Sequence, residues 1–130
     1  MSKRKQAITP GPGWGTGPYS SAVLVGDTLY VSGQGPLDPD NGNAIVGDTV
    51  EEQAEVTLRN VRTVLEQAGF GLQDVVKTNV YLEDLEDYDR FNAVYRRYFD
   101  EPLPARTLVE AKLLGIMVEV DAIAVRGAGG

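Results

Sequence analysis

The chain has 130 residues, of which 42% are hydrophobic and 24% charged, a composition typical of one globular domain. It contains no histidine and no cysteine, which excludes a histidine general base, a Cys/His zinc site and thiolate chemistry. A formal net charge of −7 disfavours RNA or DNA as a partner, because Lys and Arg contacts to phosphates supply most of that affinity. The basic start is not followed by the apolar stretch of a signal peptide, and no apolar run is long enough to span a membrane. We therefore expect a cytoplasmic protein that needs no metal or cofactor.

The two ends of the chain differ in composition from the middle. Residues 1–18 are rich in glycine and proline from Pro10 onward, which predicts a flexible arm without helix or regular strand. The glycine-rich residues 127–130 predict a frayed tail. A single domain is expected over residues 19–126.

The first half of this domain predicts a hairpin, a turn and a helix. Residues 22–25 and 28–32 are two short strand-like runs around Gly26-Asp27, and residues 36–42 have turn composition. Thr49 and Glu52 form a capping-box pattern. A one-sided apolar stripe follows and ends at Gly69, which predicts an amphipathic helix; its apolar positions are Ala54, Leu58, Val61, Leu65 and Ala68.

The second half predicts a strand, a helix and two further strands. Residues 76–82 alternate, with Val76, Thr78, Val80 and Leu82 expected on the buried face. A second helical stripe, ended by Pro102 and Pro104, consists of Leu85, Tyr88, Phe91, Val94, Tyr95 and Tyr98. Strand-like runs at 105–111 and 117–125 flank a turn near Gly115.

The order of these elements predicts an α+β fold, with both helices on one face of an antiparallel or mixed sheet. The other face would then lie bare within the chain. Because rows of Val, Leu and Ile are unfavourable in water, we expect the protein to form oligomers through this face.

Two segments carry charged side chains in apolar surroundings. Arg106 follows Pro104-Ala105, and its guanidinium fork suits a carboxylate; a structural ion pair or a surface position is the alternative. Glu119 and Asp121 share one side of the last strand, where a partly dry carboxylate can act as an acid or base. The alternative is an edge or interface pair that is neutralised by Arg or Lys.

Six blocks of the sequence, in order, resemble the RidA (YjgF/YER057c/UK114) reactive intermediate deaminase family. The resemblance covers about residues 15–126, and the blocks are 17–20, 31–34, 36–39, 75–78, 104–106 and 118–125. It implies a chorismate-mutase-like α+β sandwich and a homotrimer with sites between subunits. The implied activity is hydrolysis of 2-imino acids to 2-keto acids and ammonia, with no cofactor.

The resemblance also implies which residues act. Arg106 matches the arginine that binds the substrate carboxylate, and Glu119 matches the glutamate that positions the attacking water. The expected lining of the site also includes Tyr19, Ser32, Gly33, Asn92, Thr107 and Leu108.

This sequence departs from the family pattern at three places. Leu108 stands where many members have cysteine, Gly35 replaces a commoner aliphatic residue, and the segment between Glu110 and Glu119 is shorter than usual. The substrate can therefore differ from iminopropanoate, and an aminomuconate or another pathway enamine is an alternative. Further alternatives are a non-catalytic carboxylate-binding module, for which Arg106 suffices, and an endoribonuclease, which the net charge of −7 disfavours most.

Overall fold

A six-stranded mixed sheet forms the body of the protein in a computed structural model, which describes residues 4–130. In spatial order its strands are β1 (Gln6–Ile8), β2 (Ala22–Val25), β3 (Thr28–Gln34), β8 (Val118–Val125), β6 (Val75–Leu82) and β7 (Ala105–Glu110). Neighbouring strands are antiparallel except β6 and β7, which are parallel. The mixed sheet confirms the predicted fold class.

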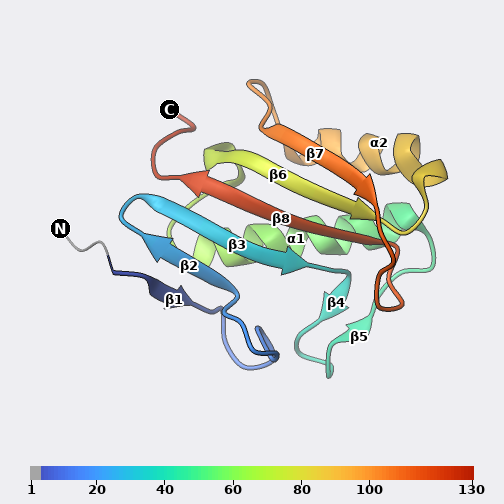
Figure 1. Ribbon diagram of the computed structural model, residues 1–130, viewed down its shortest axis with the longest axis horizontal. Coiled ribbons are helices and arrows are strands. Elements are labelled where there is room, and N and C mark those ends of the chain that lie inside the picture. Colours follow the sequence, from blue (N-terminus) through green and yellow to red (C-terminus); the bar gives the residue numbers. More distant parts are fainter. Residues whose placement is uncertain (1–3) are drawn as a thin grey trace.

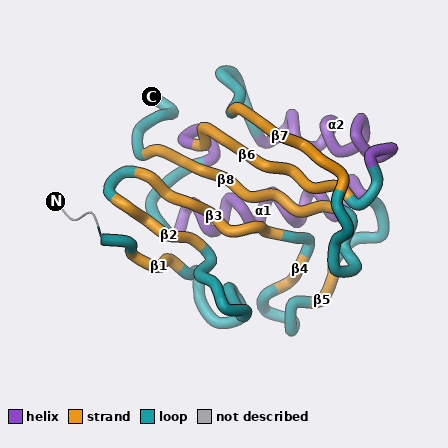
Figure 2. Tube along the Cα trace, in the orientation of Figure 1, coloured by secondary structure: helices purple, strands orange, loops and turns teal. Residues whose placement is uncertain are grey.

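Two helices, α1 (Val50–Gln67) and α2 (Tyr88–Tyr98), lie on the same face of the sheet (Figures 1 and 2). Thr49 caps α1 through the predicted capping box, since its hydroxyl accepts from the Glu52 backbone N–H. Short 3₁₀ helices at Leu72–Asp74 and Leu85–Asp87 precede β6 and α2. None of the helices among residues 4–130 is both long and apolar enough to cross a membrane.

The core lies between the helices and the sheet. Its fully buried side chains include Leu58, Phe91, Leu29, Val80 and Val120. Each such side chain contributes roughly 1.5–3 kcal/mol relative to an exposed position. The opposite face of the sheet has no cover within the described chain, and we call it the open face.

Two sequence expectations need correction. Residues 6–8 form β1, which pairs with β2, although residues 1–18 were expected to lack a strand; residues 1–3 of that predicted arm lie outside the described residues. In the 127–130 tail, which is expected to be frayed, the Gly129 N–H donates to the Asp74 carboxylate at 3.1 Å. Part of the predicted 36–42 turn belongs to a small hairpin of β4 (Leu37–Asp38) and β5 (Ala44–Ile45).

The expected facing of Val76 is also wrong. Val75 pairs with Ala124 and Lys77 with the adjacent Ile123, so Val76 is the extra residue of a β-bulge. Val76 is exposed, whereas Val75 takes the buried position. The rest of the alternation holds, since Thr78, Val80 and Leu82 are buried.

Candidate functional site

The strand register places Arg106 and Glu119 on opposite faces of the sheet. Arg106 pairs with Thr78, which in turn pairs with Ala122, and both of these side chains are buried beneath the helices. Glu119 instead pairs with Tyr81, in a row that faces the open side. Since β6 separates their two strands, the two residues cannot meet around one small ligand within one chain.

The Arg106 half-site lies between β7 and α2, and is defined here as Arg106 with Tyr88, Asn92 and Tyr95. The Arg106 Nη1 group donates a hydrogen bond of 2.8 Å to Asn92 Oδ1, and Nη2 lies 3.5 Å from the Tyr88 hydroxyl. Asn92 is buried, so its amide holds the guanidinium in place. Among residues 4–130, no carboxylate lies within 4.0 Å of Arg106 to neutralise it.

Aromatic rings complete this half-site. The Arg106 guanidinium carbon lies 4.8 Å from the Tyr95 ring centroid and 5.8 Å from that of Tyr88, both within cation–π range. Burial raises the pKa of the Tyr95 hydroxyl, which shares a hydrogen bond with Thr78 at 2.8 Å. A cavity of about 280 Å³ opens beside these groups, also lined by Leu103 and Pro104.

Tyr88 and Tyr95 contact Arg106, although the sequence pattern assigned them only to the apolar stripe of the second helix. Together with Asn92 they follow a spacing of four and then three residues, which places all three on one face of α2. A polar residue between two tyrosines on such a stripe is the signal that points to a bound group rather than to core alone.

The Glu119 half-site lies where β3 and β8 meet on the open face, and is defined here as Glu119 with Tyr19, Ser32 and Gly33. A β-bulge falls at Ser32 and Gly33, because Val31 pairs with Ala122 whereas Gln34 pairs with Val120. A Cβ atom at Gly33 would lie 2.3 Å from Glu119 Oε2, so only glycine allows the carboxylate to lie there. The Ser32 hydroxyl donates to the Ser20 carbonyl at 2.6 Å.

Burial, and to a lesser extent the nearby Asp121 charge, raise the pKa of the Glu119 carboxyl. Asp121 accepts hydrogen bonds from Asn79 Nδ2 at 2.8 Å and from the Tyr81 hydroxyl at 3.2 Å. Burial and these carboxylates also raise the pKa of Tyr81. No Lys or Arg within the described range forms a salt bridge with Glu119 or Asp121, so an ion pair does not explain either carboxylate.

The remaining predicted residues lie apart from both half-sites. Thr107 faces the open side, where its hydroxyl accepts from Lys77 Nζ at 2.9 Å. Leu108 is half-buried and packs against the core. A Cβ atom at Gly35 would lie 3.0 Å from Ile116 Cδ1, and Ile116 belongs to the short 110–119 segment. These two departures from the family pattern are therefore neighbours in the structure.

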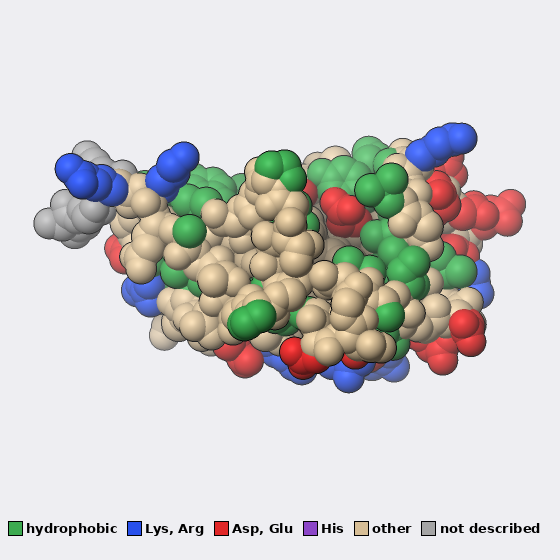
Figure 3. Space-filling view, turned by 90° about the horizontal axis from the view of Figure 1, so that it is seen from below, with side chains coloured by type: hydrophobic (Ala, Val, Ile, Leu, Met, Phe, Trp, Pro, Cys, Tyr) green, Lys and Arg blue, Asp and Glu red, His purple; other side chains and the backbone are tan. Residues whose placement is uncertain are grey.

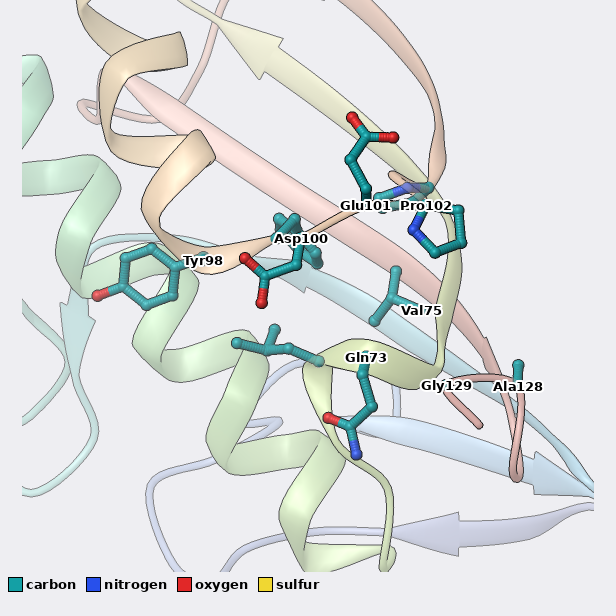
Figure 4. A pocket seen from close by; sticks show the side chains of 11 residues that line it. Gln73, Val75, Tyr98, Asp100, Glu101, Pro102, Ala128 and Gly129 are labelled. Carbon is teal, nitrogen blue, oxygen red and sulfur yellow. The ribbon is translucent and has the colours of Figure 1, made fainter.

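A separate cavity of about 250 Å³ lies beyond the end of α2 (Figure 4). Its walls come from the end of α2, the following loop, the start of β6 and the C-terminal tail. It contains Asp100 and Glu101 but no basic side chain, and the Tyr98 hydroxyl is bonded instead to Glu55 Oε1 at 2.5 Å. This cavity contains none of the predicted site residues and does not suit a carboxylate.

Residues 4–130 contain no cluster of three or more His, Cys, Asp or Glu side chains able to hold a metal ion.

Comparison with known proteins gives a consistent result. The family model described as Endoribonuclease L-PSP matches residues 14–126. A RutC family protein of Saccharolobus solfataricus is 49% identical over 110 residues, which are 83% of this chain and 86% of that protein. The 2-iminobutanoate/2-iminopropanoate deaminase of Mus musculus is 45% identical over 113 residues, 85% of this chain and 83% of that protein. The crystal structure of E. coli TdcF with bound serine superposes with a TM-score of 0.85 at 35% identity, covering 95% of this chain and 100% of that one. The chain therefore belongs to the RidA (YjgF/YER057c/UK114) family.

Proposed function

We propose that this protein is an enamine/imine deaminase, which hydrolyses 2-imino acids to 2-keto acids and ammonia. The observation that carries the proposal is Arg106, whose guanidinium is oriented by a neutral amide and two aromatic rings but not neutralised by a described carboxylate. Such a group is prepared to bind a carboxylate from a ligand through two charge-assisted hydrogen bonds. The deaminase name of the mouse relative and the serine bound to TdcF support this ligand class.

The active site is formed between two copies of the chain. Arg106 and Glu119 lie on opposite faces, so the Arg106 half-site of one subunit completes the Glu119 half-site of another. The open face supports the assembly, since it carries Tyr30, 49% exposed, between Val23 and Ile123. A homotrimer in the cytoplasm is the form that we propose.

The reaction needs only a carboxylate clamp and a base. Arg106 binds the substrate carboxylate and thereby fixes the imine carbon, which supplies proximity. Glu119, in its ionised form, accepts a proton from water as the water oxygen bonds to the imine carbon, and the imine nitrogen takes up a proton from solvent. The protonated Glu119 then gives its proton to the carbinolamine nitrogen, the C–N bond breaks, ammonia leaves, and the hydroxyl proton is lost to solvent to give the keto acid. A positioned base typically accelerates such a step by about 10²- to 10⁴-fold.

A non-catalytic carboxylate-binding module is the second candidate, because binding requires Arg106 but not Glu119. The Glu119 carboxylate favours the enzyme: it is half-buried against Gly33, has no cationic partner in the described chain, and has a raised pKa, which makes it a stronger base. An endoribonuclease is disfavoured by the net charge of −7.

Subunit mixing tests both the activity and the location of the site. Iminopropanoate is generated in situ from alanine by an amino-acid oxidase, and its disappearance is followed with and without the protein. The Arg106→Ala and Glu119→Gln variants, each inactive alone, are then co-refolded. Random pairing leaves about one interface in four with both native groups, so activity should return to about a quarter of the wild-type level. Near-wild-type activity in either variant alone would contradict the role of that residue, and no recovery in the mixture although hybrid oligomers form would contradict the shared site.

A further inference from the structure

A cavity of about 110 Å³ adjoins the Glu119 half-site and is not used by the reaction described above. We infer that it is the pocket for the substrate side chain, and that it selects 2-imino acids whose side chain is uncharged and has about four heavy atoms. This inference rests on the proposed deaminase function and deepens it. We call the cavity the side-chain pocket; its walls include Trp14, Tyr19, Gly33, Gly35, Leu37 and Asn60.

The side-chain pocket adjoins the place where the reaction is proposed to occur. Tyr19 and Gly33 line both this pocket and the open cavity that contains Glu119. Glu119 Oε2 lies directly over Gly33, at the position that a Cβ atom would occupy. A substrate whose imine carbon lies beside Glu119 can therefore extend its side chain past Gly33 into the pocket.

The walls of the pocket are fixed before any ligand arrives. From α1, Asn60 Nδ2 donates to the carbonyl groups of Gly35 and Leu37, at 3.0 and 2.9 Å. From the β4–β5 turn, Asn43 Nδ2 donates to the Gly13 carbonyl at 3.1 Å, which holds the loop that carries Trp14. Because these bonds satisfy the loop carbonyls internally, the pocket is pre-formed and binding costs little reorganisation.

The lining determines the chemistry of the group that fits. None of the residues lining the pocket is Asp, Glu, Lys or Arg, so a charged side chain would lose its hydration without gaining a partner. Trp14, Leu37 and Pro39 supply apolar surface, and Thr16, Gln34 and Asn43 supply neutral polar groups. Seen from below (Figure 3), the molecule presents mostly backbone and uncharged side chains in the lower middle of the view, an acidic patch in its upper part, and most other charged side chains toward the edges.

The size of the pocket favours side chains larger than those of the smallest substrates. Its volume corresponds to roughly four water molecules at about 30 Å³ each. A methyl or ethyl group would leave most of that volume unfilled, whereas an isobutyl or methylthioethyl group would fill it. The pocket therefore predicts a preference for the imines of leucine or methionine over those of alanine or glutamate.

Kinetics with paired variants test this inference. The imines of leucine, alanine and glutamate are generated in situ, and kcat/KM is measured for each. We expect the leucine imine to be favoured over the alanine imine by at least about 10-fold, since one methylene in a pocket is worth about 10- to 200-fold. Leu37→Phe should remove that preference by lowering kcat/KM for the leucine imine more than for the alanine imine, and Leu37→Ala should weaken it. Leu114→Phe, at a 99% exposed position outside the pocket, is the matched control.

Trp14 provides a readout that does not depend on turnover. It is the only tryptophan in the sequence, so its fluorescence reports on the pocket directly. Addition of 4-methyl-2-oxopentanoate, the product of the leucine imine, should change the emission of Trp14 at lower concentration than pyruvate does. Leu37→Phe should abolish that difference, and Trp14→Phe should abolish the signal.

The two readouts separate the failure of this inference from the failure of the proposed function. If no imine is hydrolysed faster than in buffer but 4-methyl-2-oxopentanoate still changes Trp14 emission in a Leu37-dependent way, the deaminase is wrong and the pocket stands. If the alanine imine is hydrolysed but neither the side-chain preference nor the fluorescence responds to Leu37→Phe and Leu37→Ala, the side-chain pocket is wrong and the deaminase stands.

Discussion

The two half-sites carry side chains of opposite charge, and the surroundings of these two side chains differ. Arg106 is held by Asn92 Oδ1 at 2.8 Å and lies against the Tyr95 ring, so its orientation is fixed before a ligand binds. Glu119 lies half-buried over Gly33 and is near the like charge of Asp121. The first arrangement favours binding of an anion and the second favours uptake of a proton. Binding and proton transfer are thus assigned to different surfaces of one chain, which two copies bring together in the proposed assembly.

Changes to Arg106 should have the largest effect. Arg106→Ala removes the carboxylate clamp, and we expect kcat/KM for imine hydrolysis to fall by at least about 10³-fold. Arg106→Lys should recover little of this, because an ammonium group cannot reproduce the planar fork. Arg97→Ala, which removes another arginine near the end of α2 and its surface bridge to Glu55, is the control and should retain full activity. Substantial activity in Arg106→Lys would show that a point charge is sufficient.

Glu119→Gln should have the next largest effect, and on a different kinetic parameter. The substitution preserves size but removes the proton acceptor, so kcat should fall by about 10²- to 10³-fold while keto-acid binding changes little. Ammonia release and calorimetric binding of pyruvate measure the two effects. Glu66→Gln, at an exposed position on α1, is the control. If pyruvate binds wild-type protein but no imine is hydrolysed faster than in buffer, the binding module replaces the enzyme.

The sequence predicted the elements of the fold better than their relative placement. The capping box at Thr49 and the apolar stripe that follows are local signals, and α1 begins and ends as they indicate. Strand β1 escaped prediction because it is three residues long and mostly exposed, so its neighbour β2, rather than its own pattern, defines it. Val76 was misplaced because a bulge shifts the alternation without leaving a mark in the apolar pattern.

The placement of Arg106 and Glu119 on opposite faces of the sheet could not be predicted from the sequence, because it also depends on strand pairing. Arg106 and Glu119 belong to different strands, and the alternation within each strand gives no relation between the two faces. That relation depends on the register of both strands with β6, which is a property of long-range pairing. Asn92 was identified only through the family resemblance, although its position between Tyr88 and Tyr95 on α2 is the local signal for its role.

Substitutions of Asn92 test whether the group that accepts a hydrogen bond from Arg106 must be neutral. Asn92→Ala removes the hydrogen bond that orients Arg106, and we expect KM to rise by about 10-fold. Asn92→Asp retains an acceptor but places a negative charge within hydrogen-bond distance, which would compete with the substrate carboxylate. Its KM should therefore rise more than that of Asn92→Ala. Equal effects of the two variants would show that Asn92 acts only by position.

The smallest expected effect concerns pH and the neighbour of Glu119. Burial, with Asp121 as the lesser cause, raises the pKa of Glu119, so the base becomes protonated at a higher pH than an ordinary glutamate. Activity should therefore fall as the pH decreases through this raised pKa. Asp121→Asn removes one negative charge, lowers the pKa of Glu119, and should move the acid limb of kcat/KM to lower pH. Burial, the larger cause, remains in the variant, so the shift should be only partial.

Rates are taken relative to uncatalysed hydrolysis at each pH, because the imine itself titrates. Asp100→Asn, beyond the end of α2, is the matched control and should leave the limb in place. An acid limb that does not move in Asp121→Asn would assign it to a group other than Glu119, and the division between the binding and proton-accepting surfaces would need a different base.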